Sequence, residues 1–419
     1  MNGQEVIGIL ITITAFASYI NYKFTKLHTS IGLTLITVII SFFIAGSGKL
    51  GWDVDYFSQS LLYGISFNET FLHGMLGFLL FAGSLHINTL ELAKYKATIA
   101  LLATLGVAIS TILVGYSTYF LTKFIGLNIA KEYCLLFGAI ISPTDPIAVL
   151  GVLKTAKAPK ALEMKIAGES LFNDGMAIVL FFILLAYAEE QGKQKDLSEI
   201  FMMFLREGIG GFILGAIIGW ISAKLLQTIN DYQIAIIITL AVVSGGYVLS
   251  HSILHVSGPI CMAVSGLIIG SYIKNGSMSK NTIFRLDSFW ELLDEVLNAI
   301  LFVLIGLEFL HLLLSSDTSL TSNIGVTIIS IICISIFCRW VSVMLPIGFL
   351  SIFQKYSANL ITCMTWGGLR GGISIALALS VSPSHDRDFL IVMTYSVVLF
   401  SIMVQGLTMG SLVKKLYSK

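Results

Sequence analysis

The sequence predicts an all-α polytopic membrane protein, because both its composition and its hydropathy pattern differ from those of soluble domains. Of its 419 residues, 56% are hydrophobic and only 12% are charged, and the mean hydropathy is +0.89. A soluble domain carries about 25% charged residues. Apolar runs recur along the whole chain, many of them near the length of about 20 residues that a helix needs to cross a bilayer. Outer-membrane barrels show strands of about 10 residues with alternating apolar and polar side chains. The sequence lacks this alternation, so a barrel is excluded.

Thirteen apolar runs are predicted to span the membrane. Their cores are residues 6–20, 31–45, 71–87, 97–120, 133–153, 166–188, 209–226, 233–249, 260–273, 292–314, 324–350, 360–379 and 389–413. Because these runs occupy nearly the whole chain, residues 1–419 are expected to form one integral membrane unit without a separate soluble domain. The formal net charge of +1 gives no indication of nucleic-acid binding.

The distribution of Lys and Arg predicts how the chain is oriented. With a cytoplasmic C-terminus, 16 of the 25 basic residues fall in inside segments, 7 in outside segments and 2 within spans. The strongest contribution comes from the segment after the fifth span, which contains Lys154, Lys157, Lys160 and Lys165. Because cytoplasmic loops are enriched in basic residues, the N-terminus is expected outside and the C-terminus in the cytoplasm.

An aspartate interrupts the fifth span, within the sequence Ser142-Pro-Thr-Asp-Pro146. The two prolines each remove a backbone donor and disturb the preceding turn, so the helix is predicted to break here. Broken helix ends carry partial charges that suit ion binding. A simple proline kink with Asp145 as its cap explains the same residues without a substrate, and the sequence leaves both interpretations open.

The sixth span contains Gly168-Glu-Ser-Leu-Phe-Asn-Asp174. Ser170 and Asp174 are four residues apart and therefore only about 40° apart around a helix, so their oxygens can bind one small cation. Hydroxyl, amide and carboxylate oxygens are hard ligands, as an alkali cation requires. Glu169 lies about 140° from Asp174 and must face a different neighbour. The alternative is a set of unrelated polar residues satisfied inside a helix bundle.

A third motif, Trp366-Gly-Gly-Leu-Arg-Gly-Gly372, places an arginine inside an apolar span. Its glycines suit a close helix approach or an unwound segment. Because arginine is permanently charged, a buried one needs a carboxylate or an anionic ligand. Glu169 is the carboxylate left without an assigned neighbour. We therefore predict a structural Glu169–Arg370 ion pair that holds two spans in register.

Further polar residues recur along the tenth span at Asp294, Glu295, Asn298 and Glu308. Such residues suit a funnel that leads ions towards a buried site. A cytoplasmic helix end, with long side chains reaching the membrane interface, explains most of them equally well. The sequence does not decide between these two interpretations.

In their order and spacing, the three motifs resemble those of monovalent cation:proton antiporters of the NhaP/NHE type, and the span count is similar across essentially the whole chain. The resemblance implies a secondary transporter, not an enzyme, that exchanges Na⁺, or Li⁺ or K⁺, for H⁺ without a cofactor. It also implies a homodimer with inverted repeats and two crossing broken helices. A transport core is expected over residues 92–190 and 321–413, and an interface bundle over residues 1–90 and 200–314.

The same resemblance implies which residues act on the ions. Asp174 is expected to bind the cation and the proton, with Na⁺ held at Asp174, Ser170 and Thr144. Asp145 is expected to help bind the cation, and Asn173 to hydrogen-bond across the helix crossing. Asn173 stands where related electrogenic antiporters carry a second aspartate, so one Na⁺ is predicted to exchange for one H⁺. Glu169 and Arg370 pair by the same resemblance.

One position departs from the family pattern. Many relatives carry a carboxylate in the third span, in a motif similar to Phe-Glu-Ala-x-Leu-His, whereas this chain has Phe81-Ala-Gly-Ser-Leu-His86. Ala82 therefore removes a possible accessory ligand. The chain ends at Lys419, soon after the last span, without the long tail of animal exchangers. A prokaryotic plasma (inner) membrane is the expected location.

Two other functions fit parts of the sequence. An ion-coupled symporter of a small organic solute would also use broken crossing helices, but it would need more aromatic or amide contacts than Phe172 provides. An intramembrane hydrolase could use Asp145 and Asp174 as a carboxylate pair. The neighbouring Thr144, Ser170 and Asn173 suit a cation site better than a protease, so the antiporter remains the leading hypothesis.

Overall fold

The computed structural model describes residues 3–49, 74–87, 89–156, 158–189, 197–275, 278–315, 324–352 and 356–417. These residues are helical and include no strand, as predicted. The helices are α1 (Gly3–Ile20), α2 (Thr29–Lys49), α4 (Leu76–His86), α5 (Thr89–Ala93), α6 (Lys96–Leu101), α7 (Val107–Phe124), α8 (Lys131–Ile141), α9 (Ile147–Thr155), α10 (Lys160–Glu189), α11 (Leu197–Gln227), α12 (Tyr232–Val248), α13 (Gly258–Asn275), α14 (Lys280–Ser315), α15 (Ile324–Leu350), α16 (Ala358–Trp366), α17 (Gly372–Leu379), α18 (His385–Phe400) and α19 (Leu407–Tyr417). Short π-helical segments extend or join several of them, at η1 (Asn21–Thr25), η3 (Leu102–Gly106), η4 (Leu249–Ile253) and η5 (Ser401–Gly406).

The helices follow the predicted spans. Among the described residues, seven helical segments are long and apolar enough to cross a membrane, and α2, α4 and α13 are shorter apolar helices. The fifth and twelfth predicted spans are each divided into two short helices, α8 with α9 and α16 with α17. Many outward-facing side chains are large and apolar, such as Phe43, Phe212 and Ile329. An apolar outer surface of this kind matches a lipid environment.

Polar side chains cap several helices at their first residues. The Asp231 carboxylate accepts hydrogen bonds from the backbone N–H groups of Gln233 (2.8 Å) and Ile234 (3.4 Å) and thereby begins α12. Ser357 and Ser384 accept in the same way at the starts of α16 and α18. Each cap satisfies N–H groups that have no partner inside the helix. The sequence therefore fixes these helix starts locally.

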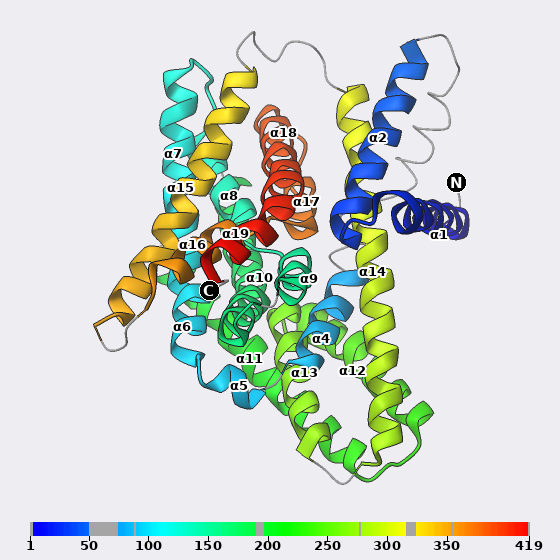
Figure 1. Cartoon of the computed structure of the whole chain (residues 1–419). Coiled ribbons are helices and arrows are strands. Elements are labelled where there is room, and N and C mark those ends of the chain that lie inside the picture. The colour runs from blue at the N-terminus through cyan, green and yellow to red at the C-terminus, as the bar shows by residue number, and fades with distance from the viewer. Residues whose placement is uncertain are drawn as a thin grey trace.

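The long helix α14 forms one side of the molecule, beside α2, and α7 and α15 form the opposite side (Figure 1). Between them lie α8, α10, α17 and α18, which pack against one another. Helices α11, α12 and α13 complete the structure near the start of α14, where α13 also packs against α4. The broken helices therefore lie inside the protein, where other helices can satisfy their free backbone groups.

Helices α11 and α13 approach each other closely along a row of glycines on α11. A Cβ atom at Gly215 would lie 2.5 Å from the Cys261 carbonyl oxygen of α13, and one at Gly211 would lie 2.7 Å from the Ser257 carbonyl oxygen. Both distances are shorter than any normal contact. Small residues at such crossings let two backbones pack together in a membrane, where lipid is as apolar as the side chains.

We expect Gly215→Ala to destabilise the protein by about 1–3 kcal/mol, because α11 and α13 must separate to admit the methyl group. Thermal unfolding in detergent measures the effect. Gly245→Ala is the matched control, since a Cβ there has nothing within 4 Å. Equal melting temperatures for the two variants would contradict the close approach.

Candidate functional site

The first part of the site is the break between α8 and α9. Helix α8 ends at Ile141 and α9 begins at Ile147, so the Ser-Pro-Thr-Asp-Pro segment is not helical. The predicted break is therefore confirmed. The break leaves carbonyl and N–H groups without helical partners. Some of these groups are hydrogen-bonded to other segments.

The second break, between α16 and α17, lies against the first. The backbone N–H of Asp145 donates to the Leu369 carbonyl oxygen over 2.7 Å, so the two non-helical segments are hydrogen-bonded where they meet. A Cβ atom at Gly371 would lie 2.6 Å from Asp145 Oδ2. Glycine is therefore required at position 371 for the two segments to approach this closely.

Helix α10 holds the first break through a network of polar side chains. The Asn173 amide nitrogen donates to Thr144 Oγ1 over 2.7 Å, and the Thr144 N–H donates to Asn173 Oδ1 over 3.4 Å. The Ser170 hydroxyl donates to the Thr144 carbonyl oxygen, and the Thr144 hydroxyl lies 3.4 Å from Ser170 Oγ. Thr144, Ser170 and Asn173 therefore gather at one point, on two segments far apart in the sequence.

Asp174 lies beside this network, and its side chain is only 5% exposed. Among the described residues its Oδ1 atom has no hydrogen-bond partner. A buried carboxylate oxygen without a partner is costly, so such groups usually meet a ligand, a proton or water. Asp174 also lines a cavity. Its position suits a carboxylate that exchanges bound ions with the solution.

The predicted Glu169–Arg370 pair is wrong, because Glu169 pairs with a different arginine. The two terminal guanidinium nitrogens of Arg339 on α15 donate to the Glu169 carboxylate, Nη1 over 2.6 Å and Nη2 over 2.8 Å. Arg339 also donates to the Met364 carbonyl oxygen over 3.2 Å. The ion pair thus joins α10 to α15, and both side chains are buried. Arg339 interrupts an apolar run just as Arg370 does, so the sequence marks it equally as a candidate partner for Glu169.

Arg370 instead satisfies the backbone of the first break. Its Nη1 atom donates to the carbonyl oxygens of Ser142 (2.7 Å) and Pro143 (3.0 Å). Its own N–H donates to Ser401 Oγ over 2.9 Å. The proline-induced break leaves such carbonyls without N–H partners. The charge of Arg370 therefore lies against the negative ends of two peptide dipoles, and this contact crosses between the two broken spans.

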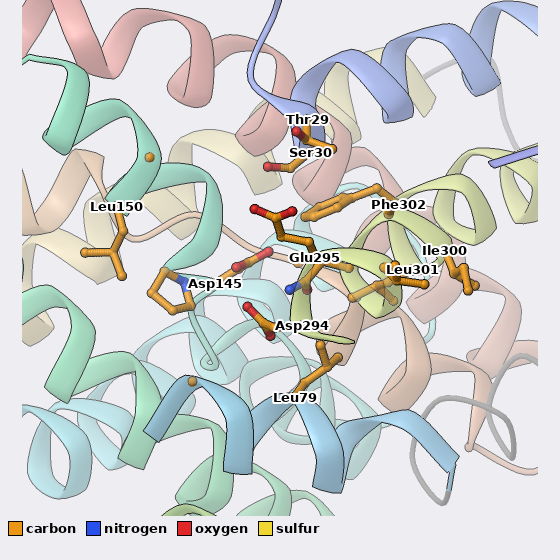
Figure 2. Close-up of a pocket in the computed structure, with 18 of the residues that line it drawn as sticks. Thr29, Ser30, Leu79, Asp145, Leu150, Asp294, Glu295, Ile300, Leu301 and Phe302 are labelled. Atoms are coloured by element: carbon orange, nitrogen blue, oxygen red, sulfur yellow. The ribbon is translucent and has the colours of Figure 1, made fainter. Parts of the chain in front are cut away.

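A cavity of about 1000 Å³ reaches Thr144, Asp145 and Asp174. Six carboxylates line it among the described residues, together with Lys154 (the carboxylates are Asp145, Asp174, Asp287, Glu291, Asp294 and Glu295). Figure 2 shows the side chains of Asp145, Asp294 and Glu295 directed into the same space. His28 also lines the cavity, and burial lowers its pKa below its usual range. His28 is thus mostly neutral at pH 7 and adds little positive charge to the cavity.

The other sequence expectations fall in different places. Asp294, Glu295 and Asn298 line the cavity, as the funnel interpretation requires, while the Glu308 side chain lies outside the described residues. Ala82 is buried in an apolar cluster with Trp290 rather than in the cavity wall. A carboxylate at position 82 would meet apolar side chains here.

Comparison with known proteins places these features in a family. The family model described as "Sodium/hydrogen exchanger, transmembrane" matches residues 10–415. The chain is 41% identical to the Na⁺/H⁺ antiporter NhaP of Pseudomonas aeruginosa, over 99% of this chain and 97% of that protein. It is 33% identical to the Na⁺/H⁺ antiporter NhaH of Halobacillus dabanensis, over 98% and 96%. The solved structure of the sodium proton antiporter MjNhaP1 from Methanocaldococcus jannaschii matches with a TM-score of 0.74 at 18% identity, over 100% of this chain and 99% of that chain.

We expect Arg339→Met to destabilise the protein by roughly 3–5 kcal/mol, because it leaves the Glu169 carboxylate buried without its partner. Thermal unfolding in detergent measures the loss. The double variant Glu169→Gln/Arg339→Met removes both charges and should recover part of the stability. Wild-type melting of Arg339→Met would contradict the ion pair.

Proposed function

The chain belongs to the sodium/hydrogen exchanger family, and we propose that it exchanges Na⁺ for H⁺ across the membrane by binding the two ions in turn at Asp174. The observation that carries this proposal is the buried Asp174 carboxylate, whose Oδ1 has no partner among the described residues and which lines an acidic cavity. Members of this family are transporters, so the protein is not an enzyme. The symporter alternative has no support among the relatives, which are named Na⁺/H⁺ antiporters.

The oxygens around Asp174 suit a small alkali cation. The proposed Na⁺ ligands are the Asp174 carboxylate, the Ser170 hydroxyl and Thr144, with Asp145 adding negative charge at the crossing. These are hard oxygen ligands, and Na⁺, Li⁺ and K⁺ all prefer them. Asn173 holds Thr144 in place through its hydrogen bonds. The protein needs no cofactor for this task, because the transported ions themselves occupy the site.

One exchangeable carboxylate implies a simple stoichiometry. Na⁺ and H⁺ compete for Asp174, so each cycle carries one positive charge in each direction. We assign Asp145 no role as a proton carrier; it lies just before α9, where the partial positive charge of the free N–H groups attracts a carboxylate. Exchange is then electroneutral, one Na⁺ for one H⁺.

The arrangement in the membrane follows from the basic residues and the family. We propose a prokaryotic plasma-membrane location with the N-terminus outside and the C-terminus in the cytoplasm. Lys154 and His28 line the cavity close to the predicted cytoplasmic loops, so the cavity opens to that side. Residues 92–190 and 321–413, which contain both broken helices, form the transport core. Residues 1–90 and 200–314 form the interface bundle of a homodimer.

Asp174→Asn should abolish exchange, because the amide can neither bind a proton reversibly nor offer a charge to Na⁺. Proton flux driven by Na⁺ in proteoliposomes is the measurement. Glu163→Gln is the control, since it makes the same change on the same helix, away from the cavity lining. Flux above background in Asp174→Asn, with Glu163→Gln active, would refute the proposal.

Electroneutral exchange predicts that transport proceeds without net current. Steady-state exchange should give no current whose sign follows the Na⁺ gradient, and a valinomycin-clamped potential should not drive uphill exchange. A sustained current would mean that a second proton carrier takes part, and Asp145, which lines the same cavity, would be the candidate.

Competition for one carboxylate also fixes the pH dependence. As pH falls, protons occupy Asp174, and the apparent KM for Na⁺ should rise by about tenfold per pH unit once the carboxyl is mostly protonated. As pH rises, the protonated form of Asp174 becomes scarce. The step that returns the proton-loaded carrier then slows, and the maximal rate should fall. A series of rates against pH and Na⁺ concentration should therefore give a bell-shaped profile, and a KM for Na⁺ that is independent of pH would contradict it.

A further inference from the structure

One face of α14 carries an oxygen-bearing side chain at every turn. Asp287, Glu291, Asp294 and Asn298 follow one another at spacings of four, three and four residues, which places them on one side of a helix. All four line the cavity. Helix α14 therefore turns a polar stripe towards the space that contains Asp145 and Asp174.

Burial is greatest at the end of this stripe near the helix crossing, while Glu291, between Asp287 and Asp294, is exposed. Asp287, whose side chain is 35% exposed, lies 4.0 Å from His86 at the outer part of the stripe. Asp294 is half-buried, and Asn298 is only 5% exposed. One turn further on, Leu301 packs against the start of α17, since a Cβ at Gly372 would lie 2.4 Å from its Cδ1. The stripe thus runs from the outer part of the cavity to the broken helices.

Asn298 has a feature that the stripe alone does not explain. Among the described residues, its buried Oδ1 atom has no hydrogen-bond donor. A buried amide oxygen without a donor normally requires a partner that the protein does not supply. Because the surrounding wall is acidic, it favours a cation over an anion as an ion bound there. Figure 2 shows Asp294 on the same wall, with Asp145 directed into the space from the opposite side.

We propose that Asp294 and Asn298 of α14, together with Asp145, form a second binding position for an alkali cation, which the ion occupies before it reaches Asp174. This inference rests on the proposed function and adds a position to it. No group of three or more His, Cys, Asp or Glu side chains among the described residues is compact enough for a metal chelate. The cation therefore keeps part of its water shell and is held weakly between α14 and the crossing.

The proposed position takes its carboxylate beside the crossing from α14 and not from α4. Ala82 is buried among apolar side chains, so α4 contributes no carboxylate there. Helix α14 supplies the carboxylate instead, from the other wall of the same cavity. A weakly held cation there raises the local ion concentration at Asp174 without competing for its proton.

Transport kinetics test the position first. Asp294→Asn and Asn298→Leu should each raise the apparent KM for Na⁺ in proteoliposomes by about fivefold or more, and should lower the maximal rate by less than they raise the KM. Asp287→Asn is the matched control, with the same charge change two turns away on the same face. Its KM should change by less than about twofold. Equal shifts in Asp294→Asn and Asp287→Asn would reduce the stripe to a diffuse negative field and overturn the inference.

One further variant and a stability measurement protect this test from effects on folding. Asn298→Asp, which keeps an oxygen ligand, should recover most of the affinity that Asn298→Leu loses. Thermal melting in detergent shows whether either variant is folded. A poor KM in folded Asn298→Asp, equal to that of Asn298→Leu, would count against an oxygen ligand at position 298.

Sodium NMR linewidths provide a measurement that does not depend on transport. In purified Asp174→Asn, added Na⁺ should still show exchange broadening that is removed in Asp174→Asn/Asp294→Asn and retained in Asp174→Asn/Asp287→Asn. Equal linewidths in all three would reject the second position while leaving the role of Asp174 intact. Persistent exchange by Asp174→Asn in liposomes would instead reject the proposed function, so the two failures are distinguishable.

Discussion

The hydrogen bond between the Asp145 N–H and the Leu369 carbonyl oxygen holds together the part of the protein on which everything else depends. It joins two broken helices inside the fold, where each break exposes backbone groups that lipid cannot satisfy. The contact requires glycine at position 371, because any side chain there would meet Asp145. A crossing of this kind is costly to build. In return it places polar backbone, a carboxylate and water-accessible space at one point within an otherwise apolar bundle.

Two buried arginines stabilise this crossing in different ways. Arg370 donates to the carbonyls of Ser142 and Pro143, so its charge replaces the N–H donors that the prolines remove. Arg339 neutralises Glu169 and ties α10 to α15. In the part of the chain that the structure describes, this division leaves Asp174, one turn from Ser170 on α10, without an arginine hydrogen-bonded to it. A carboxylate that must release a cation and accept a proton cannot be held by a permanent positive charge.

The cavity joins the crossing to α14, which packs against α2, and the start of α2 also lines the cavity. Its walls therefore come from two groups of helices, one with the broken spans and one without. Both walls carry carboxylates: Asp145 and Asp174 lie on one wall, and acidic residues of α14 lie on the other. Since like charges repel across a low-dielectric space, a cation between the walls lowers the electrostatic energy of the arrangement. The acidic stripe and the ion site thus act together on a cation in the cavity.

The sequence by itself determined the helical membrane fold, the course of the long apolar helices, the break at the two prolines, and the placement of Ser170 and Asp174 on one side of one helix. Each of these depends on local quantities: hydropathy over one helix length, proline chemistry, and the rotation of 100° per residue. It did not determine the partner of Glu169, because Arg339 and Arg370 both interrupt apolar spans and nothing local distinguishes them. Nor did it show that Ala82 faces an apolar cluster while Asp294 and Asn298 face the cavity. Those outcomes depend on which helix lies beside which and how each is rotated, and only the packing of the whole bundle decides that.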